Sequence, residues 1–128
     1  MIVLYLNSTV YNKNEKWDII KIKYYFNKKP KVIFNRINTS NPLKKDLESI
    51  ILFLKDLKRN INTNNINPNR INKIKIYSKY INNYHWRLLF DTWEYINFRG
   101  IKNASEWKEI YLLTQDLVNI NFQFEKIK

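Results

Sequence analysis

The chain has 128 residues, and 45% of them are apolar, which suits a single domain over residues 1–128 with a substantial core. It has no cysteine and one histidine, His85, so disulfides, thiolate metal sites and most histidine-based sites are excluded. No apolar run is long enough to span a bilayer, and we expect neither a cleaved signal peptide nor a presequence. The net charge of +12 and the pI near 9.8 indicate an acidic partner. Nucleic acid is favoured over an anionic membrane because the charge is spread along the chain.

The first third of the chain predicts three strands. Residues 2–10 are apolar at both alternating sets of positions, which indicates a central strand covered on both sides. Residues 17–26 alternate, with Lys21 and Lys23 on the face opposite to the apolar side chains, so this face should meet solvent or a polyanion. A hairpin turn over 27–30 then leads to a third strand over 31–37.

The clearest helix follows these strands. Asn41 is a favourable N-cap, Pro42 suits the first helical position, and apolar residues at helical spacing form one stripe as far as Leu57. Residues 59–72 are rich in asparagine, contain Pro68, and lack a periodic apolar pattern. They are predicted to form a long loop.

The remaining elements alternate between strand and helix. Residues 73–77 predict a fourth strand, and 78–98 predict one helix or two in tandem, with Gly100 just past the helix end. Asn103 and Glu106 resemble a capping box that starts a helix to about residue 118. Residues 120–124 alternate as a closing strand. The order predicts an α/β fold with a mixed five-stranded sheet: an antiparallel three-strand meander, then parallel strands connected by helices that pack against the sheet.

Four segments together resemble ribonuclease HI over nearly the whole chain. They are Thr39-Ser-Asn41, Ser78-Lys-Tyr80-Ile81, the pair Trp86 and Trp93, and residues 103–126. The resemblance implies the ribonuclease H fold. It also implies a site in which acidic side chains hold two Mg²⁺ ions that activate water and stabilise the leaving oxygen.

The carboxylates that the resemblance calls for are largely absent from the matching positions. The family's first-strand Asp falls at Leu6 or Asn7, and its fourth-strand Asp falls at Tyr77 or Ser78. The family's last helix, with its remaining acid, would lie beyond the final residue. Its helical Glu falls near Asp46 or Glu48, and for these we favour the interpretation that both are solvated partners of Lys45 and Lys44. The resemblance therefore implies the fold without hydrolysis, and we expect no catalytic residue, metal ligand or cofactor.

Basic residues carry the expected function, which is the binding of structured RNA through phosphate contacts that read no base sequence. They lie in the early hairpins, at the start of the first helix and around the asparagine-rich loop. The residues expected to bind RNA are Lys21, Lys23, Lys28, Lys29, Lys31, Arg36, Lys44, Lys45, Arg59, Arg70, Lys73 and Lys75. Exposed Tyr or Trp side chains would stack on unpaired bases, whereas Trp86, Trp93 and Trp107 at helical positions are expected in the core.

The composition suggests a setting for this function. The chain is rich in Asn, Ile, Lys and Tyr and has one Gly, as expected where A and T dominate the codons. A small, strongly basic chain of this kind fits a ribosomal protein encoded by a mitochondrial genome and located in the mitochondrial matrix, bound to ribosomal RNA and neighbouring proteins. An AT-rich virus or plasmid would produce similar biases, so these settings stay open.

Two other functions stay open at the level of sequence. One is a Mg²⁺-dependent nuclease of the ribonuclease H class that uses unconventional ligands such as Asp46, Glu48 and Asp91. The other is a protein-interaction subunit whose basic face docks an acidic neighbour.

Overall fold

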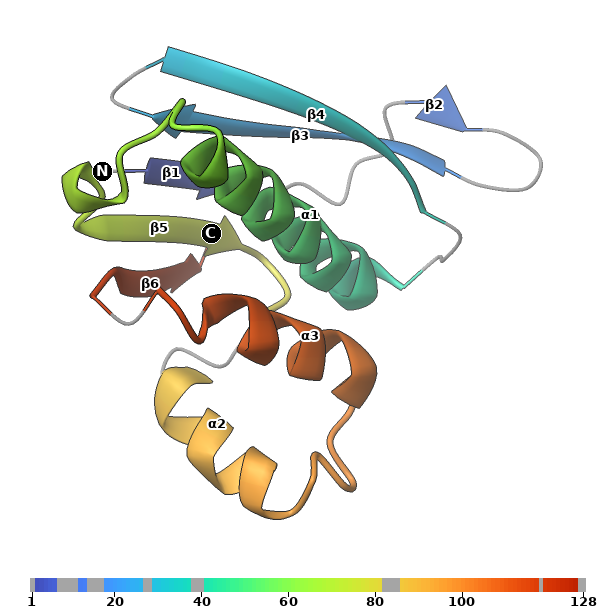
Figure 1. The fold of residues 1–128 in the computed structure, drawn as a ribbon. Coiled ribbons are helices and arrows are strands. Elements are labelled where there is room, and N and C mark those ends of the chain that lie inside the picture. Colours follow the sequence, from blue (N-terminus) through green and yellow to red (C-terminus); the bar gives the residue numbers. More distant parts are fainter. Residues whose placement is uncertain are drawn as a thin grey trace.

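The structure is a computed structural model that describes residues 2–6, 12–13, 18–26, 29–37, 41–81, 86–117 and 119–126 (Figure 1). These residues form one mixed sheet and the helices that pack on it. In chain order the elements are β1 (Ile2–Tyr5), β2 (Asn12–Lys13), β3 (Asp18–Phe26), β4 (Lys29–Ile37), α1 (Pro42–Asn62), the short 3₁₀ helix η1 (Pro68–Arg70), β5 (Lys73–Ser78), α2 (Trp86–Tyr95), α3 (Ala104–Thr114) and β6 (Asn121–Lys126).

The sheet has the strand order β4-β3-β1-β5-β6, and the two-residue strand β2 pairs with the start of β3. Strand β3 is antiparallel to both β4 and β1, whereas β1 is parallel to β5 and β5 is parallel to β6. The five longer strands, counted along the chain, therefore lie in the order 3-2-1-4-5. This is a ribonuclease H-like topology, and the predicted fold class is confirmed.

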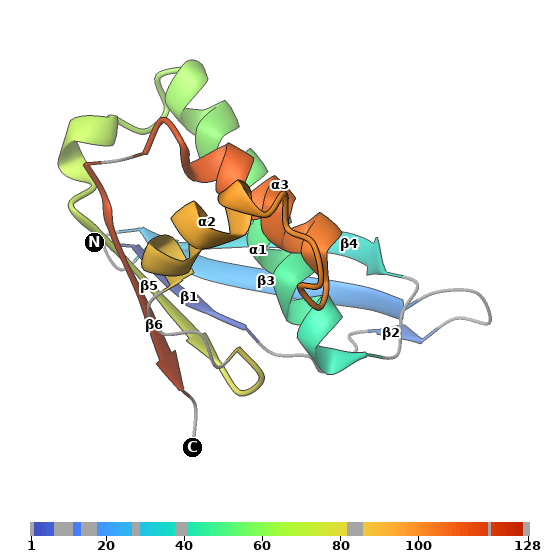
Figure 2. The ribbon, with the colours of Figure 1, turned by 90° about the horizontal axis from the view of Figure 1, so that it is seen from below.

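In the part of the chain that the structure describes, helices cover only one face of the sheet. Figures 1 and 2 show α1 crossing that face, with α3 beside α1 and α2 beside α3 on the same side. Within the described residues, no helix lies on the opposite face. The sheet therefore has a buried face and a bare face. Each strand contributes side chains to both faces, because successive residues of a strand point to opposite sides.

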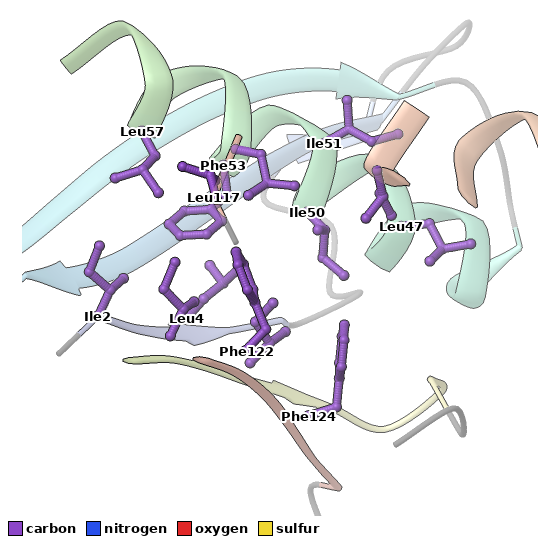
Figure 3. Packing of buried hydrophobic residues seen from close by; sticks show 14 of the residues in the cluster. Ile2, Leu4, Leu47, Ile50, Ile51, Phe53, Leu57, Leu117, Phe122 and Phe124 are labelled. Carbon is purple, nitrogen blue, oxygen red and sulfur yellow. The ribbon is translucent and has the colours of Figure 1, made fainter. Parts of the chain in front are cut away.

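The core lies between the sheet and α1. Strands β1, β3, β5 and β6 contribute alternate residues to it, and α1 contributes the predicted apolar stripe together with Phe53 (Figure 3). The strand and helix residues that meet there include Ile2, Leu4, Ile22, Tyr24, Ile74, Ile76, Phe122, Phe124, Leu47, Ile50, Phe53, Leu54 and Leu57. Tyr24 joins the two layers, because its ring lies edge-on to Phe53 and its hydroxyl donates a 2.6 Å hydrogen bond to Asp56 on α1. Each large apolar side chain buried here contributes about 1.5–3 kcal/mol.

Helix α1 begins as predicted and ends later than predicted. The Asn41 side chain accepts hydrogen bonds from the backbone N–H groups of Leu43 and Lys44, with Pro42 in the first turn. The helix then continues to Asn62, past the residue at which the loop was expected to begin. Local polar contacts support this extra turn, since the Asn60 amide donates to the backbone carbonyl of Asp56. The expected loop is thus shortened and contains η1.

The prediction of helix over residues 78–98 is wrong at both ends. Ser78 is the last residue of β5, residues 79–81 are not helical, and α2 spans only Trp86–Tyr95. The cap that ends α2 is Asn97 rather than Gly100. Asn97 has a φ of +54°, its N–H donates to the carbonyl of Glu94, and the N–H of Phe98 donates to that of Trp93. This is a Schellman motif, completed by the contact between the Phe98 and Trp93 rings.

The last helix also differs from its prediction. Asn103 occupies the N-cap position of α3, but its φ is +57° and its side chain makes no capping hydrogen bond. The capping box is not formed, because the Glu106 carboxylate lies 3.6 Å from the Lys44 ammonium group instead. Helix α3 ends at Thr114, before the predicted residue 118, which lies outside the described residues.

The first and last strands of the chain agree with their predictions in position. Strand β6 covers Asn121–Lys126, and β1 covers Ile2–Tyr5 of the strand predicted over 2–10, of which residues 7–10 lie outside the described part of the chain. None of the helices in the described residues is long and apolar enough to cross a membrane.

Candidate functional site

The ends of β1 and β5 lie together at one edge of the sheet, where the resemblance would place an acidic site. The Leu6 N–H donates a 2.8 Å hydrogen bond to the Tyr77 carbonyl, which holds the two parallel strand ends together. Leu6 is buried directly after β1, and Ser78 is buried at the end of β5. Apolar and hydroxyl side chains thus stand at this edge, and Asn7 lies outside the described residues.

Asp46 projects from α1 toward this edge, on the helix-covered side of the sheet. It is 1% exposed, and its Oδ2 accepts a 2.7 Å hydrogen bond from the Ser78 hydroxyl. The Ser78 oxygen in turn accepts from the N–H groups of Tyr80 and Ile81, each at 3.1 Å. Burial raises the pKa of Asp46 from 3.8 to about 6, and the Ser78 hydrogen bond opposes this rise. The interpretation of Asp46 as a solvated partner of Lys45 is therefore wrong.

Glu48 lies elsewhere, in a shallow groove of about 300 Å³ between α1 and α3. Glu106 and Glu109 of α3 line the same groove. Burial raises the pKa of Glu48, Lys44 lowers it, and the two neighbouring glutamates raise it further. Lysines neutralise the groove, since Lys44 pairs with Glu106 at 3.6 Å and Lys55 pairs with Glu109 at 2.9 Å.

The three acids of the alternative nuclease site do not form a cluster. Asp46 is buried against β5, Glu48 lines the groove between α1 and α3, and Asp91 is exposed on α2. Across the described residues, no group of three or more His, Cys, Asp or Glu side chains is placed to hold a metal ion.

The bare face of the sheet carries a second arrangement of side chains, which we call the open face. Its members occupy strand positions that alternate with the buried ones, so they point away from the helices. The described side chains of the open face are Val3, Lys23, Tyr25, Pro30, Val32, Phe34, Lys73, Lys75, Tyr77, Asn121, Gln123 and Glu125.

Strand register places cations and apolar groups side by side on the open face. Val3 is paired with Tyr25 of β3 on one side and with Lys75 of β5 on the other. Lys23 is the direct cross-strand partner of Val32, and its Nζ lies 5.4 Å from the centroid of the Tyr25 ring. The open face therefore combines positive charge with aromatic and aliphatic surface.

Edge strand β4 contributes the most exposed apolar side chains of this surface. Val32 is 44% exposed and Phe34 is 54% exposed, and Pro30 on the same strand is also exposed. Sequence reasoning missed these residues as part of a site. Their signal was the period-two spacing of Val32 and Phe34 in the predicted third strand with Pro30 at the end of the predicted turn.

The structure separates the residues predicted to bind RNA. Lys23, Lys73 and Lys75 come together on the open face. Lys29 and Lys31 of β4 lie on the other face of the sheet, since they are paired with Phe26 and with buried Tyr24.

The other predicted basic residues lie away from the open face, or their side chains lie outside the described part of the chain. Lys44 and Arg59 on α1 pair with Glu106 and Asp56, Arg70 is exposed in η1, and Lys45 is only 7% exposed. Lys21 and Arg36 belong to β3 and β4, but their side chains, like all of Lys28, lie outside the described part.

The tryptophans occupy the core, as predicted, where their side chains are described. Trp93 and Trp107 are buried and lie edge-on to each other, and Phe90 and Tyr111 complete the aromatic contact between α2 and α3. The Trp86 side chain lies outside the described residues.

Comparison with known proteins found no relative of this chain. The chain matches no protein-family model and no curated protein. The strand order and pairing define it as an α/β protein with a ribonuclease H-like arrangement of strands and helices.

Proposed function

We propose that this protein is a non-catalytic RNA-binding protein on a degenerate ribonuclease H-like fold, and that its open face contacts structured RNA. The observation that supports the proposal is a sheet face that no helix among the described residues covers and that carries Lys23, Lys73 and Lys75 beside aromatic side chains. The net charge of +12 adds a long-range attraction for a polyphosphate.

The side chains at the ends of β1 and β5 support a function without hydrolysis. Leu6, one of the two positions at which the resemblance calls for a carboxylate, follows β1, and Asp46 accepts a hydrogen bond from Ser78. This hydrogen bond between a buried carboxyl group and a hydroxyl group is a structural contact between α1 and β5. We propose that the family resemblance persists as a framework and as nucleic-acid affinity.

The proposed setting is a ribosome in the mitochondrial matrix, with the protein encoded in an AT-rich organelle genome. The skewed composition and strong basicity support this setting. Its test is the purification of intact mitochondrial ribosomes. The protein should remain on particles washed with salt, and its absence from them would remove the ribosomal assignment.

The RNA-binding proposal is tested by the salt dependence of binding to purified RNA. In Lys23→Ala/Lys75→Ala, two phosphate contacts are lost, so the slope of log K against log salt should fall by about 1.4 for single strands or about 1.8 for duplex regions. The matched control is Lys102→Ala/Lys108→Ala, which removes two exposed lysines in and next to α3. The control should retain the wild-type slope.

Two results would replace the proposal with one of its alternatives. Equal losses in the two double variants would show that the open face is not the RNA site. Mg²⁺-dependent cleavage of an RNA/DNA hybrid, abolished by Asp46→Asn, would establish the nuclease instead. In the native complex, nuclease footprinting or crosslinking should place RNA against this chain, whereas crosslinks only to an acidic protein would support the interaction subunit.

A further inference from the structure

Building on the proposed function, we propose that the open face binds an unpaired stretch of RNA, with bases stacked on Phe34 and Tyr25 and phosphates held by Lys23 and Lys75. The strands present these four side chains on one surface, since each alternates with residues of the buried face.

The first step concerns the apolar strip along β4. Pro30, Val32 and Phe34 are exposed on alternate positions of an edge strand, spaced by about 6.7 Å along it. Adjacent apolar side chains on a surface indicate a partner that covers them. The partner of this strip must therefore present apolar faces.

The second step concerns the charge beside the strip. Lys23 of β3 is directly opposite Val32 of β4. Lys75 of β5 lies two strands away from Lys23. Two strand spacings and two residues of offset place the backbones of these lysines about 12 Å apart. The same partner must therefore carry negative charge at intervals as it crosses the strands.

The third step selects the occupant. A duplex presents phosphates and sugars but hides the faces of its bases inside the stack, so it would leave Phe34 uncovered. An unpaired strand presents phosphates and free base faces together, and aromatic side chains on a sheet are a known platform for such bases. Charge complementarity and the exposed ring of Phe34 thus favour unpaired RNA over a duplex, an acidic protein or a lipid surface.

The experiment compares a labelled oligouridine of about 12 nucleotides with an RNA duplex of the same length. Wild-type protein should bind the oligouridine more tightly. Phe34→Leu keeps an apolar side chain but removes the ring, so it should weaken oligouridine binding roughly 5- to 100-fold and leave duplex binding unchanged. Phe34→Tyr should bind as the wild type does. The control is Tyr95→Leu, which removes an aromatic ring that is 92% exposed on α2 and should change neither affinity.

The outcomes separate this inference from the proposed function. If both RNAs bind equally and Phe34→Leu matches Tyr95→Leu, unpaired RNA is not the ligand of the open face, while a dependence on Lys23 and Lys75 would still support phosphate binding. If neither RNA binds, both proposals fail. Binding to phosphatidylserine vesicles that depends on Phe34, without binding to oligouridine, would assign the open face to a membrane surface and overturn both.

Discussion

The buried carboxyl group of Asp46 should give this domain a pH-dependent stability of predictable sign. Burial raises its pKa from 3.8 to about 6, so the folded state holds this proton more tightly than the unfolded chain does. The resulting stabilisation is complete below about pH 3.8 and is lost as the pH rises through about 6. At neutral pH the folded protein retains a desolvated carboxylate and is less stable for it.

The magnitude follows from the two pKa values. At 1.36 kcal/mol per pKa unit, the rise is worth about 3 kcal/mol, of which about 2 kcal/mol falls between about pH 4.5 and pH 7.5. Asp46→Asn removes the titration at nearly constant size. The free energy of unfolding of the wild type minus that of the variant should therefore fall by about 2 kcal/mol over this range as the pH rises.

Urea unfolding provides the measurement, with tryptophan fluorescence as the signal because Trp93 and Trp107 are buried. Taking the difference between two proteins cancels the titration of their shared groups. Asp91→Asn is the matched control, since Asp91 is exposed on α2. A difference for Asp46→Asn that does not vary with pH, or that grows as the pH rises, would refute the assignment of Asp46 as a desolvated carboxyl group.

Three further substitutions test the packing, each by urea unfolding at neutral pH. Ser78→Ala removes the donor to Asp46 and the acceptor for two backbone N–H groups, so it should lower the free energy of unfolding by about 1–3 kcal/mol, and an unchanged value would contradict these hydrogen bonds. Asn97→Ala should cost about 1 kcal/mol because of its positive φ, whereas Asn97→Gly should cost less; the reverse order would exclude the Schellman cap. Phe53→Ala should cost about 3–5 kcal/mol since Phe53 is fully buried, and a small loss comparable to that of exposed Phe34→Ala would place Phe53 outside the core.

The order of strands and helices was predictable because the patterns are long and agree with one another. The apolar stripe of α1 and its Asn41 cap identify a helix, and the alternation around Lys23 identifies a strand with one polar face. Helix ends were less predictable, because they depend on single backbone conformations. Gly100 was the favoured stop by residue type, yet Asn97 adopts the left-handed conformation that ends α2.

The candidate site was predictable only in part, because it depends on which face the helices cover. Lys23 could be assigned to a polar face from its strand, but the exposure of Val32 and Phe34 follows from the placement of α1, α2 and α3 on the other side. Asp46 was misread for a related reason. It stands in the run Lys44-Lys-Asp46-Leu-Glu48, which is typical of a solvated helix turn, and its burial depends on where β5 ends in space.

The one-sided cover of the sheet has a consequence for handling the isolated protein. Copies carrying a charge of +12 repel one another at low ionic strength, and this repulsion opposes contact between their uncovered strands. Concentrated salt shortens the reach of that repulsion to about 3 Å at 1 M, while leaving apolar attraction intact. Isolated protein moved into concentrated salt should therefore aggregate through the β4 edges of separate molecules unless a polyanion is present.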